Sequence, residues 1–538
     1  MEPIGRRSLI VGAAAAVGAL QLRAAGLPLP SPRRQARLVD DPFALGVASG
    51  DPTSTGFVAW TRLAPDPTNG GGVGPDPVAV SWEVASDAGF GQVVQSGQVT
   101  VIAELAHSVH VDVDGLDPDG EWWVRFTADG FDSPVGRART LPASGTAALR
   151  FGFVSCQKYA SGYYTALRGL AGEGCDLWLH LGDYIYENGA TGPVRSEGPD
   201  EIFTLADYRN RYGLYKSDLD LRAAHQAAPV IPVWDDHEVD NNYAGTDGVG
   251  GPAQIIARRT AGYRAWFEHL PVRLPAPTGP DLTIYRRFAW GDLATFHMLD
   301  GRQYRDPQPC ADESGLVVDC PARLGEDRTM LGAEQRQWLS DGIDGSGAVW
   351  DVVGQQTVFA PLPIAGGYNV DQWDGYPQDR QRVWDILQRR PNPVVCTGDI
   401  HAAGVAQLNQ TLGDAGTEQV GTELVGTSVS SSFLDDPAII DAAQAIIEGL
   451  DYIEYANVRQ RGYTVVDLTA DAMRAEYKVV SDATVPDGTI SSAFVYDREA
   501  RMSVTPPPEE TPPGGAPTVP PGTAPPATPI SGQASFTG

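Results

Sequence analysis

The chain has 538 residues, of which 42% are hydrophobic and 20% are charged, as in a globular protein long enough for two or three cores. Its formal net charge of -29 excludes bulk electrostatic attraction to phosphate backbones or anionic bilayers, so we expect no stable nucleic-acid binding. A substrate that carries phosphate would need a local cation, either a metal ion or a few arginines.

The N-terminus has the features of an export signal. Arg6 and Arg7 precede an apolar run, Leu9 to Leu20, that is too short to span a bilayer comfortably, and small residues follow it. This pattern predicts a twin-arginine signal peptide over residues 1–36, and therefore a secreted protein that meets the twin-arginine export machinery. The alternative is a chance arginine pair before a buried helix. We expect the mature protein to lack membrane spans and to be a monomer.

Residues 37–145 are expected to form a β-sandwich. Short runs of alternating apolar and polar residues at 57–63, 78–86, 108–116 and 121–128 are separated by Gly, Pro and Asp clusters. The Cys–Trp–Cys spacing of a true immunoglobulin domain is missing, so a fibronectin-like sandwich is the closer expectation.

Residues 146–502 change to alternating strands and helices, which favours a layered α/β domain with a largely buried sheet. A pair of antiparallel strands is expected near its end, at 461–480. Strands are expected at 149–156, 176–183, 230–238, 293–300, 349–356 and 393–402, and helices at 162–172, 204–215, 221–228, 255–270, 332–343 and 379–390.

The tail and the cysteines complete this outline. Eleven of the last 38 residues are proline, so residues 503–538 are expected to be disordered. Cys310 and Cys320 suit a disulfide in an exported protein. Cys175 and Cys396 have no ligand-like context and are expected to be structural.

Four of the expected strands end in side chains that can bind metal. In an open α/β sheet, the carboxyl ends of the strands form the crevice where ligands bind. Several carboxylates in one crevice would repel one another, and a multivalent cation removes that penalty. The sequence therefore predicts a metal site with more than one ion. The residues at these ends are Cys156, Asp183, the triplet Asp235–Asp236–His237, and Asp399 with His401.

The donor types indicate which metals would bind. The chain has eight histidines and few of them fall at strand ends, which disfavours a histidine-rich zinc site. Carboxylate, phenol and thiolate donors suit a ferric ion, with calcium or a similar oxygen-binding ion beside it. Tyr186 follows Asp183 by three residues and would reach the same ion if the chain turns after Gly182.

The motifs "FGFVSCQ", "HLGDYIYE", "VWDDHEVDNNYAG", "LDGRQYR" and "CTGDIHAA" closely resemble, in this order, those of the PhoD-type alkaline phosphatases. These are exported metallophosphoesterases that are distantly similar to purple acid phosphatases. The segment "FALGVASGDPTSTGFVAWTRL" is similar to the start of that family's β-sandwich. The resemblance covers about residues 42–500 and implies a four-layer α/β metallophosphoesterase fold that holds Fe3+ and Ca2+.

The resemblance also implies roles for single residues. Asp183 would bridge the two ions, and His237 would be a general acid or a phosphate ligand. Arg302 would orient the phosphate, although Gly301 replaces a threonine that is frequent in the family. The choices between Asp235 and Asp236, and between Asn241 and Asn242, stay open. Iron would be bound by Cys156, Asp183, Tyr186 and His401, and the second ion by Asp183, Asp236, Asp399 and Asn242.

The expected activity is hydrolysis of small-molecule or lipid phosphate esters by a metal-bound hydroxide. One alternative is a phosphodiesterase, including a phospholipase D-like branch of the same family. A second alternative, from a different class, is a cell-surface binding protein with an inert α/β part. The intact set of donors at the strand ends counts against this second alternative.

Overall fold

The computed structural model describes residues 38–310, 316–318, 320–364, 366–432 and 436–501, which belong to one compact unit. The predicted signal peptide at 1–36 and the predicted disordered tail at 503–538 lie outside the described residues. Within the described ranges, no helix combines the length and apolar character needed to cross a membrane.

The predicted sandwich is built from two facing sheets whose alternating residues meet in one core. Phe57 and Val109 from one sheet pack with Val80 and Phe126 from the other. One sheet contains β3 (Val78–Ala85), β4 (Val93–Val101), β6 (Glu121–Ala128), β7 (Phe131–Asp132) and β8 (Gly136–Arg139), and the other contains β1 (Val47–Gly50), β2 (Phe57–Arg62) and β5 (Ser108–Val113).

The second sandwich sheet continues into the main sheet of the α/β part. β1 pairs in parallel with β13 (Val230–Val233), with Gly50 opposite Val230. β2 is consequently buried on both faces. On the face turned away from the sandwich core, Trp60 donates a hydrogen bond of 3.1 Å from Nε1 to the carbonyl of Glu268.

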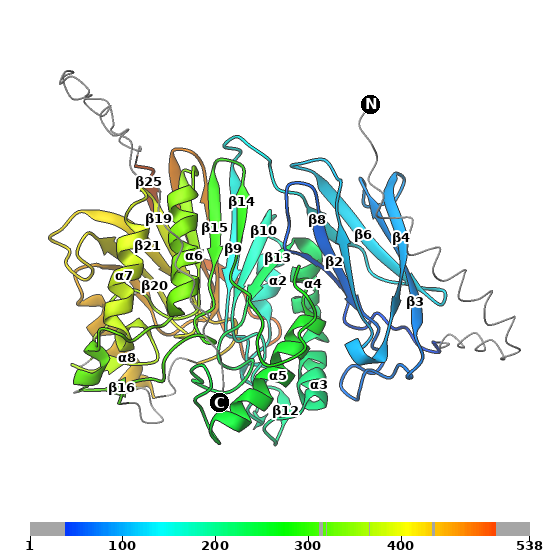
Figure 1. Cartoon of the computed structure of the whole chain (residues 1–538), viewed down its shortest axis with the longest axis horizontal. Helices are drawn as coiled ribbons and strands as arrows, with labels where there is room; N and C mark the ends of the chain where they lie inside the picture. The colour runs from blue at the N-terminus through cyan, green and yellow to red at the C-terminus, as the bar shows by residue number, and fades with distance from the viewer. Residues whose placement is uncertain (1–37, 311–315, 319, 365, 433–435, 502–538) are drawn as a thin grey trace, which may run out of the picture. The chain divides into compact units, whose positions relative to one another are not determined.

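In the described part of the chain, two large mixed sheets form the α/β part (Figure 1). They face each other through contacts such as the rings of Phe151 and Phe296, whose centroids are 5.2 Å apart. The nine-stranded sheet runs β25 (Ile490–Glu499), β24 (Ala472–Val480), β23 (Gly462–Leu468), β9 (Leu149–Val154), β10 (Leu177–Leu181), β13, β1, β2 and β5. The seven-stranded sheet runs β14 (Arg286–Trp290), β15 (Ala294–Met298), β17 (Trp350–Gly354), β19 (Pro393–Thr397), β21 (Gln419–Val425), β20 (Ala403–Asn409) and β22 (Ile453–Asn457).

Helices cover the outer faces of these sheets and complete the four layers. α2 (Thr165–Ala171) and α4 (Leu219–Ala227) contact the nine-stranded sheet, and α3 (Leu205–Lys216) packs on α5 (Pro252–His269). α6 (Gly332–Gly345) and α7 (Pro377–Leu387) place Leu339 and Val383 in a core with Val353 and Val395 of the seven-stranded sheet. The predicted α/β fold class is confirmed.

The strands and helices predicted from periodicity are all present, but several further elements were not predicted. Between Ala403 and Asn457 the chain forms β20, β21, α8 (Pro437–Glu448) and β22. The ten-residue β25 was also missed. Several short strands were missed because two- and three-residue strands leave too few positions for a periodic pattern. The short strands are β7, β11 (Ala190–Thr191), β12 (Ser196–Gly198), β16 (Leu316–Val317) and β18 (Tyr368–Asn369).

The cysteines follow the prediction. Cys310 and Cys320 form a disulfide with their Cα atoms 5.9 Å apart. Cys175 and Cys396 are free thiols buried in the hydrophobic core.

The junction between β1 and β13 depends on a glycine. A Cβ atom on Gly50 would lie 2.4 Å from the carbonyl oxygen of Pro271 and 2.6 Å from that of Val230. We expect Gly50→Ala to lower the free energy of unfolding by about 1–3 kcal/mol, because backbone must move to admit the methyl group. Thermal or urea unfolding measures this change.

The matched control is Gly74→Ala, since a Cβ on Gly74 meets no atom within 4 Å. Equal stabilities of the two variants would contradict a tight junction at Gly50.

Candidate metal centre

Four parallel strands carry the predicted donors to one place. β9, β10 and β13 are neighbours in the nine-stranded sheet and are followed by Cys156, Asp183 and the Asp235–His237 triplet. β19 of the seven-stranded sheet is followed by Asp399 and His401. The ends of the two sheets meet here, since Ser155 and Ser428 form a parallel bridge.

The backbone at these strand ends adopts a conformation that is rare for residues other than glycine. Such strain persists where the surrounding structure holds it, and it clusters at functional sites. Gly182 has a φ of 106°, and a Cβ there would lie 2.3 Å from the Cβ of Asp235, so only glycine allows these strand ends to approach. Positive φ angles occur at Cys156 (59°), Asp183 (56°), Asn242 (55°), Asp399 (62°) and His401 (58°).

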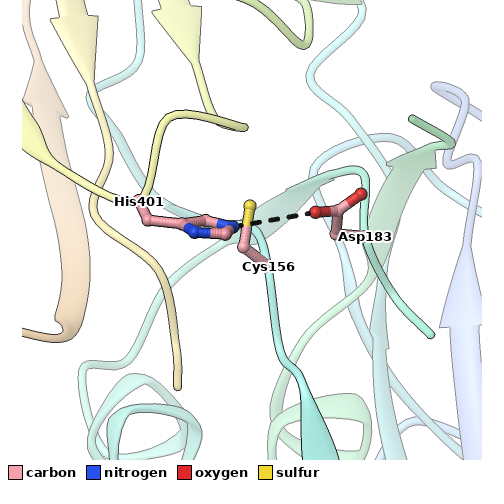
Figure 2. A group of neighbouring side chains, drawn as sticks. All are labelled: Cys156, Asp183 and His401. Atoms are coloured by element: carbon pink, nitrogen blue, oxygen red, sulfur yellow. Dashed lines mark ion pairs between the residues drawn. The ribbon is translucent and has the colours of Figure 1, made fainter. Parts of the chain in front are cut away.

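The first donor group contains Cys156, Asp183 and His401, which each offer one donor atom within 4.8 Å of the other two (Figure 2). The phenol of Tyr186 joins them, donating a 2.8 Å hydrogen bond to Asp183 Oδ2 and lying 3.1 Å from His401 Nε2. His401 Nδ1–H donates to the carbonyl of Ser432 at 2.7 Å, which leaves the Nε2 lone pair facing the group. The four predicted iron ligands therefore share one small volume.

The second donor group contains Asp235, Asp236 and Asp399, also within 4.8 Å of one another. Asp236 belongs to a further group with Asp183 and His237, so its carboxylate adjoins donors of both predicted ligand sets. The backbone N–H of Asn242 donates to Asp236 Oδ2 at 2.7 Å, which places the predicted Asn242 at the same site.

The carboxylates repel one another and are shielded from water. Burial, reinforced by neighbouring carboxylates, raises the pKa of Asp183 well above the usual range. Burial also raises the pKa of Asp235 well above that range and the pKa of Asp399 to about 7, although Arg302 opposes both shifts. The pKa of Asp236 shifts downward, because Arg302 and His237 outweigh its burial.

Three buried carboxylate oxygens of the site lack hydrogen-bond partners, which is consistent with binding of cations. Asp183 Oδ1, Asp235 Oδ2 and Asp236 Oδ1 are buried and have no hydrogen-bond partner in the described structure. A buried anionic oxygen without a partner is costly, and a metal ion removes that cost. Burial, followed by the charge of Asp183, raises the pKa of the Cys156 thiol and of the Tyr186 phenol. A strongly Lewis-acidic ion would be needed to deprotonate them.

Arg302 lies among the carboxylates and is fully buried. Its guanidinium donates two hydrogen bonds to Asp371, at 2.7 and 2.8 Å, and a further one to Asp235. A weaker contact of 3.3 Å reaches Asp399. The guanidinium therefore neutralises and positions these carboxylates, and its contact with phosphate stays a prediction.

Glu187 orients His237, and the sequence interpretation did not assign it a role. His237 Nδ1–H donates to Glu187 Oε2 at 2.6 Å, and the imidazole ring packs on Tyr186 with centroids 4.1 Å apart. Burial alone would lower the pKa of His237, but Glu187, Asp236 and Asp183 raise it well above the usual value. Glu187 is the last residue of the motif "HLGDYIYE", so its position in that motif could have indicated a role at the site.

Glu238 is a second carboxylate that the sequence interpretation missed. It is fully buried and accepts hydrogen bonds from three backbone N–H groups: Asp235 at 2.8 Å, Asp183 at 3.2 Å and Tyr184 at 2.5 Å. One side chain thus connects the loops that follow β10 and β13. Its proximity to Asp183 could not be inferred from the sequence, because 55 residues separate them.

Comparison with known proteins agrees with this geometry. The family model for the PhoD-like phosphatase matches residues 151–477, and the model for its N-terminal domain matches residues 29–142. The chain belongs to the PhoD-like phosphatase family. Alkaline phosphatase D of Bacillus subtilis (strain 168) is 43% identical over 477 residues, which are 85% of this chain and 81% of that protein. A solved structure of PhoD matches with a TM-score of 0.81 and 42% identity, covering 86% of this chain and 91% of the other.

Family membership confirms the predicted resemblance and the predicted enzyme class. The chain is a PhoD-like phosphatase, a phosphoric ester hydrolase of a metal-dependent family, and its described residues include the candidate metal groups given above. The alternative of an inert scaffold is set aside for this reason.

Glu238→Gln tests whether this PhoD-like phosphatase depends on the buried carboxylate that joins two of its loops. The amide keeps one acceptor oxygen but turns an N–H group toward backbone N–H donors. We expect a loss of about 1–3 kcal/mol in the free energy of unfolding and a lower metal content per chain. Chemical denaturation and elemental analysis measure the two effects.

Glu104→Gln is the control, because Glu104 is exposed and remote in sequence from every strand end of the site. A Glu238→Gln protein with the stability and metal content of its parent would show that the three hydrogen bonds do not position the donors.

Proposed function

We propose that this PhoD-like phosphatase is an exported enzyme that hydrolyses phosphate esters with one Fe3+ and one Ca2+ ion. The observation that carries the proposal is the group of buried carboxylate oxygens without hydrogen-bond partners, which lies beside a thiol, a phenol and an imidazole. Oxygen donors suit calcium, and the mixed donor set suits a ferric ion. Cys156, Asp183, Tyr186 and His401 are the proposed iron ligands, and Asp183, Asp236, Asn242 and Asp399 are the proposed calcium ligands.

The bound cations would supply Lewis-acid chemistry, neutralising the phosphoryl oxygens and lowering the pKa of water. His237 would donate a proton to the departing alkoxide. Glu187 occupies Nδ1 of this imidazole, which leaves Nε2–H available for donation. Arg302 would hold Asp235 and Asp399 in place while the charge on the phosphate changes. We retain the prediction that Arg302 also orients the phosphate.

Two features support export. The Arg6–Arg7 pair and the apolar run after it fit recognition by the twin-arginine machinery. The Cys310–Cys320 disulfide fits an oxidising compartment outside the cytoplasm. The proposed substrates are small-molecule or lipid phosphate esters, acted on by a monomer. The net charge of -29 supports the absence of nucleic-acid partners.

Asp183→Asn tests the two-cation centre, because Asp183 is the proposed bridge between the ions. We expect kcat/KM to fall at least about a hundredfold, with a loss of bound metal. Protein purified without chelator is analysed for iron and calcium, and is assayed on a phosphomonoester, a bis-aryl phosphodiester and phosphatidylcholine. The three substrates rank phosphomonoesterase, phosphodiesterase and phospholipase activity.

Asp292→Asn, on the β14–β15 turn, is the matched control outside the centre. The proposed function would be contradicted by a parent protein that contains no metal and hydrolyses none of the three substrates. It would also be contradicted by an Asp183→Asn protein that is as active as the parent.

His237→Asn tests the proton donor, since asparagine can still hydrogen-bond to Glu187 but cannot act as an acid. We expect kcat for an alkyl phosphate to fall about a hundredfold more than kcat for p-nitrophenyl phosphate, whose leaving group needs little protonation. Steady-state assays with both substrates measure the difference. Equal losses on the two substrates would assign His237 to phosphate binding. The control is His107→Asn, in the sandwich, which should leave the ratio of the two kcat values unchanged.

A further inference from the structure

Lys158 is a cation beside the metal centre, and no role assigned above uses it. It follows Cys156 by two residues, and its side chain is half-buried. The Nζ atom lies 5.1 Å from the centroid of the Tyr186 ring, which is within the range of a cation–π contact. The chain has three lysines, Lys158, Lys216 and Lys478, so the behaviour of this one can be followed separately in solution.

The Tyr186 ring connects Lys158 to the donors of the centre. The phenol of Tyr186 donates to Asp183 at 2.8 Å, and the imidazole of His237 packs on the same ring with centroids 4.1 Å apart. The ammonium therefore contacts a proposed iron ligand whose ring also contacts the proposed proton donor. An ester whose phosphate binds at the centre comes within reach of the ammonium, because the lysine side chain is long and flexible.

The ammonium of Lys158 is not balanced by a carboxylate in the described part of the chain. Within those residues it contacts the Tyr186 ring and forms no ion pair or hydrogen bond. Its three N–H donors are therefore left for solvent or for a ligand. The two other lysines differ, because Lys216 is buried and Lys478 pairs with Glu476 at 3.4 Å.

Arg302 also brings a cation to the centre, but it is less available to a substrate. Its side chain is fully buried and donates to Asp235 and, through two hydrogen bonds, to Asp371. A further contact of 3.3 Å reaches Asp399. These carboxylates already neutralise the guanidinium, whereas the half-buried ammonium of Lys158 can still bind an incoming anion.

Hydrogen bonds fix the backbone that carries Lys158. Its N–H donates to Ser431 Oγ at 3.3 Å, and its carbonyl accepts a 2.8 Å hydrogen bond from Ser430 Oγ. The N–H of the preceding Gln157 donates to the carbonyl of Asp183 at 3.1 Å. The backbone of the lysine is thus tied to the loop of a proposed metal ligand, which lowers the entropic cost of a contact with substrate.

We propose that Lys158 binds an anionic oxygen of the substrate phosphate and shifts the preference of this enzyme toward phosphomonoesters and away from phosphodiesters. A phosphomonoester carries about two negative charges at neutral pH, whereas a phosphodiester carries a single one. The ammonium is a compact charge with rotatable donors, so it stabilises a bound dianion more than a monoanion. The inference rests on the proposed hydrolysis of phosphate esters and names the class of ester that this residue selects.

Lys158→Gln tests the selection, because the amide keeps a polar side chain but removes the charge. The ratio of kcat/KM for p-nitrophenyl phosphate to kcat/KM for bis(p-nitrophenyl) phosphate is measured in the metal-loaded parent and in the variant. We expect this ratio to fall about tenfold in Lys158→Gln. Lys158→Arg restores the charge and should keep the ratio within about threefold of the parent value. The control is Lys478→Gln, which should leave the ratio unchanged.

The outcomes separate this inference from the proposed function. An equal loss on the two esters would mean that Lys158 only supports the Tyr186 ring, and it would overturn the inference. Unchanged kinetics in a folded Lys158→Gln protein would also overturn the inference, while hydrolysis by the parent would still support the phosphatase function. A metal-loaded parent that hydrolyses neither ester would overturn both.

A second measurement does not depend on turnover. Acetylation of the lysines by N-hydroxysuccinimidyl acetate is followed by peptide mass spectrometry in metal-loaded protein, with and without inorganic phosphate at constant ionic strength. Phosphate at about ten times its Kd should slow the acetylation of Lys158 about tenfold, because only the unoccupied fraction reacts, and should leave Lys478 unchanged. Equal rates with and without phosphate, or equal slowing of both lysines, would overturn the contact.

Discussion

The central constraint on this structure is the burial of several carboxylates at the place where two sheets meet. Asp183, Asp235, Asp236 and Asp399 come from three strand ends and lie largely out of contact with water. Arg302 balances part of their charge, yet three of their oxygens still have no hydrogen-bond partner in the described structure. Cations bound among them would remove the remaining cost, which couples metal binding to the stability of the folded chain.

The backbone around the centre is arranged to make this crowding possible. Gly182 lets the ends of β10 and β13 approach, and Glu238 joins the following loops through three backbone N–H groups. The left-handed backbone at Cys156, Asp183 and other proposed ligands turns the chain sharply at each strand end. These conformations cost conformational free energy, and they occur at the same residues that have a proposed role in the chemistry, as is common at functional sites.

The N-terminal sandwich is part of the same framework as the catalytic sheet. β1 continues the sheet beside β13, and β2 packs its second face on α5 through Trp60. β13 in turn carries Asp235, Asp236 and His237 at its other end. The sandwich therefore stabilises the strand that precedes proposed ligands, and this is a structural role for the N-terminal region in a phosphatase.

The amino-acid sequence was sufficient to predict the class of fold, the order of the main strands and helices, and the residues at the strand ends. Periodicity encodes these features locally, and the motifs around Asp183, His237 and His401 were sufficient to indicate a metallophosphoesterase. Cys156, Asp183 and the Asp235–His237 triplet could be named because parallel strands end at one edge of a sheet, whereas Asp399 and His401 come from the end of a strand in a second sheet.

The packing of the folded chain brings separate segments together at this site. It joined the sandwich to the catalytic sheet, placed Arg302 among the carboxylates, and brought Glu187 to His237 and Glu238 to Asp183 across about fifty residues of chain. The physical reason is that such contacts depend on the relative position of packed elements, which no local pattern of residues records.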